Sequence, residues 1–290
     1  MGNFIDTANL DKNKIEVKAN NECKGKIKTI EEYLKAVYKG YKELWPGSPP
    51  EFGKQLWFRG VKAQNYVMLP SIARETHNAN LETFYLSQFK SKAIPYLGQI
   101  PAYPFSEGLM GYWDWLFLMQ HYGVPTRLMD WSSDALVALL FATDPNLNEK
   151  EKQEDPAVWL LNPIKLNEKF KFEDYYPKGY IPNVEEASVM KLFGPDSESD
   201  NKRPAAVYGP DNSPRIIAQK GVFTVFPFIQ NMVELDKLPG NKEFLYKILI
   251  CKEKRDELNE QLRKIGITRA QLFPEMGSIA NAIRQEHFWK

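Results

Sequence analysis

Three short stretches of the sequence carry side chains that can bind or transfer an anionic group. The first is Leu-Trp-Phe-Arg-Gly at 56–60, where three large apolar residues run into Arg59 and Gly60. The apolar residues are typical of a short buried strand, so Arg59 is expected where that strand leaves the core. A guanidinium there presents a planar fork to a carboxylate or phosphate, and Gly60 lets a ligand come close. On these five residues alone, an arginine that caps a carbonyl or pairs with a structural acid is the commoner arrangement.

The second stretch runs from Gln120 to Ala142 and begins Gln-His-Tyr-Gly-Val-Pro-Thr-Arg-Leu-Met-Asp-Trp-Ser-Ser. His121 is expected at the end of a helix, where it either bonds the last carbonyls or faces a ligand. Arg127 and Asp130 stand three residues apart in a predicted strand. Their side chains therefore point to opposite faces, and the two residues are not automatically partners.

Within this stretch, Asp130-Trp131-Ser132-Ser133 lies at the turn from the strand into the next helix. A helix N-terminus offers free backbone N–H groups, which are a ready site for a phosphate. The alternative is that Ser132 or Ser133 only caps the helix.

The third stretch, at 213–226, reads Ser-Pro-Arg-Ile-Ile-Ala-Gln-Lys-Gly-Val-Phe-Thr-Val-Phe. Its polar positions around the two isoleucines are Arg215 and Gln219. Gln219 either faces a pocket as a hydrogen-bond donor and acceptor or bonds the backbone of a turn.

The familiar catalytic motifs are not found in the sequence. It has no glycine-rich phosphate loop, no His-Glu-x-x-His, no paired Cys-x-x-Cys and no Gly-x-Ser-x-Gly. With three histidines in the chain, a metal site of several imidazoles is not expected, and we predict no metal. A nuclease built on His121 and Asp130 has little support, because the carboxylate cluster that would hold Mg²⁺ is not evident.

Helices and strands that must position these residues follow one another irregularly along the chain. Thr29 and Glu32 form a capping box that starts the first helix, and Gly123 is a stop signal for a later one that Ser106 would start. The expected strands are 55–60, 126–131, 157–163, 221–228 and 244–251, and the expected helices are 29–45, 80–97, 106–123, 133–143, 252–266 and 274–285. This order lacks the regular alternation of a doubly wound sheet and predicts a mixed α+β fold.

Composition and charge limit the classes of partner and compartment. The 38 basic and 37 acidic residues leave a net charge of +1, which argues against a nucleic acid held mainly by bulk charge. No apolar run is long enough to cross a membrane, and the first residues lack the apolar core of a signal peptide. We therefore expect a cytoplasmic protein with no membrane partner, in which Cys23 and Cys251 are free thiols.

The domain organisation is expected to be simple. We predict an N-terminal helical extension over 1–50 and one α+β domain over 51–290. The polar segments 144–156 and 194–204 are interpreted as exposed loops within that domain, because apolar segments continue on both sides.

The motifs together resemble a known family. Trp-Phe-Arg-Gly at 57–60, the segment 120–142, Ala-Gln-Lys-Gly-Val-Phe-Thr-Val-Phe at 218–226 and the late Gly-Ile-Thr-Arg-Ala-Gln-Leu-Phe-Pro-Glu-Met are similar to the FRG domain, named for its Phe-Arg-Gly motif. The resemblance covers about Leu56 to Met276. The family is one of uncharacterised bacterial and phage-associated proteins.

A more distant resemblance, to ADP-ribosyltransferases of the Arg-Ser-Glu type, implies a chemistry. Those enzymes carry an arginine at the end of the first core strand, a serine-containing strand that enters a helix, and a later strand with Glu-x-Glu. Here Arg59, the segment 130–142 and the segment around Gln219 occur in the same order. The resemblance implies a central, mostly antiparallel split sheet with N- and C-terminal helices, and NAD as the substrate of a glycosyltransferase.

The resemblance also implies roles for individual residues. Arg59, Ser132, Gln219 and Asp130 would be catalytic, and the NAD-binding residues would be Arg59, Gly60, His121, Arg127, Trp131 and Ser133. Gln219 departs from the pattern, because a glutamine carries no negative charge to oppose a developing oxocarbenium ion. Either another acid, Asp130 or Glu275, takes that role, or transfer is weak or absent.

Two functions from different classes remain open on the sequence. One is an ADP-ribosyltransferase-like domain that binds NAD or a related nucleotide and acts as a toxin or phage-defence effector on a protein or nucleic-acid target. The other is a non-catalytic module that binds a phosphate-bearing ligand or a nucleic-acid end. Gln219 in place of an acid, and the lack of a strong nucleophile and base pair, favour the second. The oligomeric state is left unknown.

Overall fold

The computed structural model describes residues 23–47, 55–76, 81–99, 111–169, 179–197, 202–211, 213–229 and 231–287. Its strands are β1 (Trp57–Val61), β2 (Leu128–Ser132), β3 (Ala157–Leu161), β4 (Ala205–Val207), β5 (Gly221–Val225) and β6 (Leu245–Leu249). Its longer helices are α2 (Ile30–Leu44), α4 (Leu81–Ala93), α5 (Tyr112–His121), α6 (Ala135–Ala142), α11 (Arg255–Lys264) and α13 (Met276–His287). The shorter ones are α3 (Ser71–Thr76), η1 (Ile94–Gln99), α7 (Glu149–Gln153), α8 (Pro163–Lys169), α9 (Ala187–Phe193), α10 (Pro214–Gln219), η3 (Leu235–Lys237), η4 (Asn241–Glu243), η5 (Lys252–Lys254) and α12 (Arg269–Leu272).

The strands form one antiparallel sheet that divides in the middle. Its order is β4-β5-β2-β1-β3-β6, so the first strand in sequence lies near the centre. β1 pairs with β3 along its whole length, and β2 pairs in the same way with β5. Between β1 and β2, in contrast, the register joins one residue pair, Phe58 and Ser132. The two halves of the sheet therefore separate beyond this pair, which agrees with the expected α+β fold and its antiparallel split sheet.

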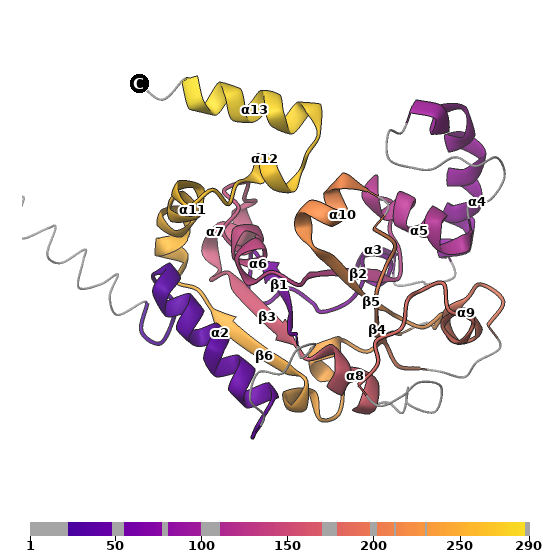
Figure 1. Ribbon diagram of the computed structural model, residues 1–290, viewed down its shortest axis with the longest axis horizontal. Helices are drawn as coiled ribbons and strands as arrows, with labels where there is room; N and C mark the ends of the chain where they lie inside the picture. The colour runs from indigo at the N-terminus through magenta and orange to yellow at the C-terminus, as the bar shows by residue number, and fades with distance from the viewer. Residues whose placement is uncertain are drawn as a thin grey trace, which may run out of the picture.

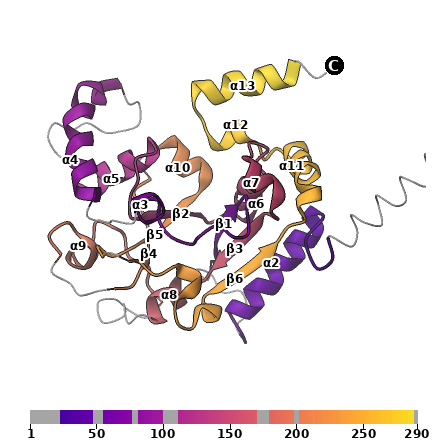
Figure 2. The same cartoon turned by 180° about the vertical axis from the view of Figure 1, so that it is seen from behind.

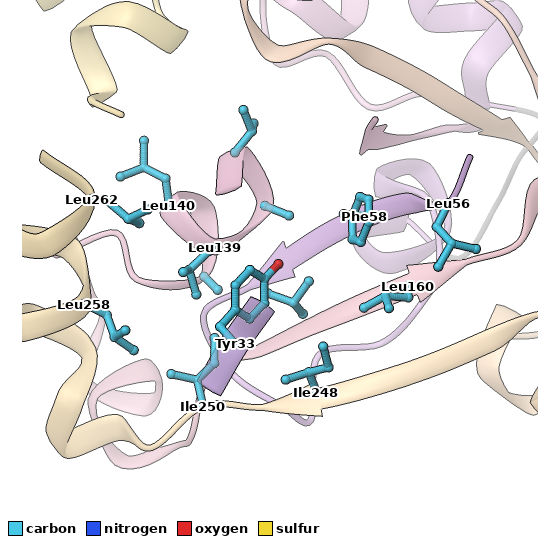
Figure 3. Close-up of a cluster of buried hydrophobic side chains, with 14 of the residues drawn as sticks. Tyr33, Leu56, Phe58, Leu139, Leu140, Leu160, Ile248, Ile250, Leu258 and Leu262 are labelled. Carbon is cyan, nitrogen blue, oxygen red and sulfur yellow. The ribbon is translucent and has the colours of Figure 1, made fainter. Parts of the chain in front are cut away.

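Helices from both ends of the chain cover one face of the β1-β3-β6 half. α2 lies along β6, and α6 and α11 lie beside it over the same half (Figure 1). Figure 3 shows Tyr33 of α2 among side chains of these helices and strands, including Leu139, Leu160 and Leu258. Because these residues bury their apolar surface together, the N-terminal helix belongs to the same core as the strands.

A second group of helices covers the other half of the sheet. α4, α5 and α9 lie at the opposite end of the molecule from α2 (Figure 2). The side chains of α5 are apolar on nearly all sides, and they pack with Leu128 of β2, Val207 of β4 and Phe223 of β5. This packing fixes α5 beside β2, and His121 is the last residue of α5.

The structure confirms two of the expected helix ends and changes one expected loop. Thr29 caps α2 by accepting from the backbone N–H of Glu32, as predicted. Gly123, at φ +78°, follows the end of α5, also as predicted, while Ser106 lies outside the described residues. The segment 144–156 is not simply an exposed loop, because it contains α7 and the carboxylate-bearing residues Glu151 and Asp155 are buried.

Cys23 and Cys251 are joined by a disulfide, which corrects the expectation of two free thiols. Their Cα atoms are 5.2 Å apart although 228 positions separate them in the chain. Next to the bond, Ile27 pairs with Ile250 as an isolated β-bridge. The long-range pairing was invisible in the sequence, and it removes one argument for a cytoplasmic location. No described helix combines the length and apolar character needed to cross a membrane.

Candidate functional site

A cavity of about 250 Å³ lies where the two halves of the sheet separate. Strands β1, β2 and β5 and helices α5, α6 and α10 contribute its walls. The residues that line it are Phe58, Arg59, Gly60, Phe117, Gln120, His121, Asp130, Trp131, Ser132, Phe141, Arg215, Ile216, Gln219, Gly221 and Phe223. All three stretches that were singled out in the sequence therefore meet at one place.

Arg59 extends across the gap between the separated strands. Its Nη1 donates to the backbone carbonyl of Asp130. Burial lowers the pKa of Arg59 to about 10, and nearby Arg74 lowers it too, while Asp130 opposes the change. Arg59 therefore stays a cation at neutral pH, and within the described ranges no carboxylate forms an ion pair with it. One donor is used by a carbonyl, which leaves the rest of the guanidinium for a ligand.

Gly60 also lines the cavity, but packing explains why it is a glycine. A Cβ at this position would lie 1.9 Å from the carbonyl oxygen of Ala138 and 2.7 Å from the backbone nitrogen of Ala142. Both atoms belong to α6, so β1 and this helix approach at backbone contact. The close contact between strand and helix therefore accounts for the glycine, and the approach of a ligand to Gly60 stays a prediction.

His121 ends α5 and turns one side to the cavity. Burial lowers the pKa of the imidazole, and the positive charge of Arg215 lowers it further, against a weaker opposing effect of Glu275. His121 is consequently neutral at pH 7, able to donate from one ring nitrogen and accept at the other. Glu275, named above as an alternative acid, does not line the cavity and is exposed.

Asp130 supplies the carboxylate of the cavity wall. Its Oδ1 accepts from Nε2 of Gln120 at 2.5 Å. The other end of Gln120 is fixed as well, because its Oε1 accepts from the hydroxyl of Thr126. This chain of hydrogen bonds orients an exposed carboxylate without neutralising its charge.

The serines join β2 to α10 instead of capping a helix. The hydroxyl of Ser132 donates to the carbonyl of Gln219 at 2.7 Å and accepts from the backbone N–H of Asp134 at 3.0 Å. Asp134 is the residue that caps α6, because its Oδ1 accepts from the first backbone N–H groups of that helix. Its carboxylate occupies the place that was proposed for a phosphate. Ser133 lies outside the cavity lining and bonds the carbonyl of Lys220.

Trp131 lies in β2 between Asp130 and Ser132 and lines part of the cavity, but its indole is buried. The ring belongs to the core on the opposite face of the sheet, and its Nε1 donates to Thr224 at 3.1 Å. The indole is therefore a core side chain and is not placed to stack on a ligand.

Gln219 lies in the cavity wall at the last position of α10, not in a strand. Its Nε2 donates to the carbonyl of Leu272 at 3.0 Å. A glutamate could not donate to that carbonyl, so the amide suits this position. The hydrogen bond ties the cavity wall to α12, which lies above α10 in Figure 1.

Arg127 is separated from the site, which corrects its assignment as a ligand-binding residue. Its side chain is fully buried, and Nε donates to Glu82 of α4 at 2.7 Å. The remaining nitrogens donate to Tyr112 and to the carbonyls of Phe193 and Phe226. Every nitrogen of the guanidinium donates a hydrogen bond. Arg127 therefore forms a structural ion pair with Glu82, and its contacts hold α4, α5 and β2 together.

Sequence reasoning missed part of the cavity wall. Arg215 was named as a polar position without an assigned role, and Gln120 and most aromatic residues of the wall were not singled out. The aromatic residues recur at the spacing of buried helix and strand positions. The sequence pattern is therefore the same for a residue of a cavity wall and for a residue of the core. The aromatic lining residues are Phe58, Phe117, Phe141 and Phe223.

Residues 54–152 match the model of the FRG domain family. The match contains β1, α5, β2 and α6, which supply Arg59, His121, Asp130 and Phe141 to the cavity, respectively. No curated protein and no solved structure matches the chain.

Proposed function

Residues 54–152 of this chain form an FRG domain, and we propose that the cavity at its split sheet binds NAD or a related nucleotide. The proposed reaction is that of an ADP-ribosyltransferase-like enzyme. The observation that carries the proposal is the meeting of Arg59, Ser132 and Gln219, from three separate stretches, around one cavity. A guanidinium, an ordered carboxylate and aromatic walls within one partly enclosed space suit a ligand that has phosphates and a flat base.

The chemistry of the lining residues can be assigned on this proposal. Arg59 binds a phosphate oxygen of the ligand through the nitrogens that the carbonyl of Asp130 leaves open. The Asp130 carboxylate faces the positive charge that develops on the ribose when the bond from C1′ to nicotinamide breaks. With water as acceptor, NAD and water give ADP-ribose, nicotinamide and a proton. With a target nucleophile, the new bond joins C1′ to that group, and nicotinamide and the proton of the nucleophile are released.

A non-catalytic binding module is the second candidate, and the hydrogen bond of Gln219 favours it. The amide that stands in the place of the acid of Arg-Ser-Glu ADP-ribosyltransferases donates to the carbonyl of Leu272. Asp130 is then the carboxylate left for catalysis in this cavity, and Gln120 already holds it. Ligand binding without turnover would be the result. Under the first candidate, NAD consumption or target modification is compatible with a toxin or phage-defence role.

Isothermal titration with NAD, together with chromatography of released nicotinamide and intact-protein mass spectrometry, tests both candidates. We expect NAD to bind the wild-type chain, and Arg59→Ala to weaken binding by at least about tenfold, because the guanidinium contact to phosphate is lost. The control is Arg74→Ala, which removes a nearby cation that does not line the cavity.

The outcomes separate the candidates. Binding with nicotinamide release or an ADP-ribose adduct supports the transferase. Binding with neither product supports the non-catalytic module. If neither NAD nor ADP-ribose binds and no adduct forms, the nucleotide proposal is wrong.

A further inference from the structure

Arg215 is a second cation in the cavity wall. It belongs to α10, whereas Arg59 belongs to β1, and it is half-buried. Its Nη1 donates over a long 3.4 Å to the carbonyl of His121. In the part of the chain that the structure describes, no carboxylate forms an ion pair with Arg215. Most of its hydrogen-bonding capacity is therefore open.

The position of Arg215 is set by an aromatic ring. Its guanidinium lies over the ring of Phe273 at 4.6 Å from the centroid. That ring also contacts Phe141, a lining residue, at 5.9 Å between centroids. Stacking holds a guanidinium in place without neutralising it, so the group remains available to an anion.

Arg269 provides a comparison on the same ring. Its guanidinium is also 4.6 Å from the centroid of Phe273. Unlike Arg215, it forms an ion pair with Asp144, and it does not line the cavity. The two arginines thus share a stacking partner and differ in whether their charge is satisfied by an acid.

The charges that face the cavity do not balance. Arg59 and Arg215 contribute two positive charges, and Asp130 contributes the negative charge among the lining residues. His121 is neutral near pH 7 because burial and Arg215 lower its pKa. An anionic ligand would therefore meet an excess of positive charge inside a partly enclosed space, where electrostatic attraction is stronger than in bulk water.

The volume of the cavity limits how much of a ligand it can enclose. Pockets for drug-sized ligands usually measure about 300–1,000 Å³. The cavity here has about 250 Å³, which lies below that range. A whole dinucleotide is larger than a drug-sized ligand, so at most one nucleotide unit fits inside.

We propose that the cavity encloses a single mononucleotide unit, whose phosphate is bound by both Arg59 and Arg215, and that the second half of any dinucleotide remains outside. This inference rests on the proposed nucleotide-binding function and narrows it to a ligand class. Arg215, together with Arg59, then makes binding depend on a phosphate attached to the nucleoside.

Titration with a graded set of probes tests the ligand class. The probes are nicotinamide riboside, nicotinamide mononucleotide and NAD, which differ by one phosphate and then by the second nucleotide. We expect the mononucleotide to bind within about threefold of NAD, and the riboside at least about tenfold more weakly than the mononucleotide.

Two variants test the role of Arg215. Arg215→Ala should reduce the preference for mononucleotide over riboside to less than about threefold, because the second phosphate contact is lost. Arg269→Ala is the matched control, since it removes a guanidinium from the same ring and should leave the preference at its wild-type value. If Arg215→Ala does not fold, as judged by its thermal melt, Arg215→Gln replaces it, because the amide keeps a polar side chain without the charge.

Each result bears on a different claim. If NAD binds the wild-type chain but Arg215→Ala keeps the full phosphate preference, the role of Arg215 is wrong while the proposed function stands. If NAD binds more than about tenfold more tightly than the mononucleotide, the cavity takes more than one nucleotide unit and the ligand class is wrong. If no probe binds the wild-type chain, both this inference and the proposed function fail.

Discussion

At the scale of single residues, the surroundings of two arginines decide two different roles. Arg59 has a carbonyl as its hydrogen-bond partner and faces a cavity. Arg127 has no exposed surface, and its guanidinium bonds Glu82, a tyrosine hydroxyl and two carbonyls. A buried charge without its partner is costly, whereas a cation at a cavity wall can be solvated when it is alone. Stability and ligand binding should therefore depend on different arginines.

Substitution of each arginine checks this division. Arg127→Ala should lower the free energy of unfolding by about 3–5 kcal/mol, because it leaves Glu82 buried and unpaired. Arg59→Ala and Arg59→Lys should each cost about 1 kcal/mol, the value of one hydrogen bond, and both should lose ligand affinity because lysine lacks the planar fork. Urea unfolding beside NAD titration measures both effects. A large loss of stability in Arg59→Ala with unchanged affinity would remove Arg59 from the site.

His121 should make the stability of the protein depend on pH. Burial and Arg215 lower its pKa in the folded state below the ordinary 6.5. As the pH falls through the unfolded value, the unfolded chain takes up a proton that folded His121 does not, so stability decreases. We expect His121→Gln to lose less stability than the wild type between about pH 7.5 and pH 5.5. Equal slopes of melting temperature against pH in the two proteins would contradict this expectation.

At the scale of elements, the separation of β1 from β2 creates the cavity. One residue pair joins the two strands, and helices α6 and α10 both contribute residues to the wall of the cavity. The approach of α6 depends on Gly60, whose missing side chain lets β1 contact the helix backbone. α12 is joined to α10, because Gln219 donates a hydrogen bond to the carbonyl of Leu272. The shape of the cavity is thus a property of packed elements, not of one motif.

A methyl group at position 60 should disturb this packing. Gly60→Ala places a Cβ against the backbone of α6, so helix or strand must shift, and we expect a loss of about 1–3 kcal/mol with weaker ligand binding. Gly277→Ala is the matched control, because no atom lies within 4 Å of its added Cβ. Alanine in that helix should be neutral or stabilise by up to about 1 kcal/mol. A fully stable Gly60→Ala variant, measured by urea unfolding, would show that α6 can move away freely.

At the scale of the whole molecule, contacts between distant segments close the fold. α2 packs on the β1-β3-β6 half of the sheet, together with α11 from the other end of the described chain (Figure 3). The disulfide between Cys23 and Cys251 lies at the junction of these segments and encloses most of the chain. The side-chain atoms of both cysteines and Glu253 lie within 4.8 Å of one another. Because both sulfurs are bonded in the disulfide, neither is a thiolate that could bind a metal ion with Glu253.

Breaking the disulfide should weaken the fold without removing the cavity residues. A thiol-reactive dye should find no free thiol under denaturing, non-reducing conditions, since both cysteines are bonded. Reduction, or the double change Cys23→Ser and Cys251→Ser, should lower stability by about 2–4 kcal/mol, because the unfolded chain gains freedom. The serine variant serves as the control, as a reductant should not change its melting temperature. Two titratable thiols in the wild-type chain would show that the bond is absent.

The amino-acid sequence by itself determined the features that depend on neighbouring residues. Thr29 and Glu32 predicted the start of α2, and short apolar runs predicted β1, β3, β5 and β6, because capping and burial patterns are local. The mixed α+β class followed from the order of these elements. The three polar stretches were also visible, since each interrupts an apolar run.

Only the tertiary structure decided which of those polar residues share a site. Arg59 and Arg127 look alike in sequence, and the difference is that Glu82, 45 positions before Arg127, lies against it. In the same way, Gly60 is required by α6, and Cys23 finds its partner 228 positions away. Contacts of this kind join residues far apart in the chain, and no local pattern encodes them. Their positions follow from how whole helices and strands bury their apolar faces against one another.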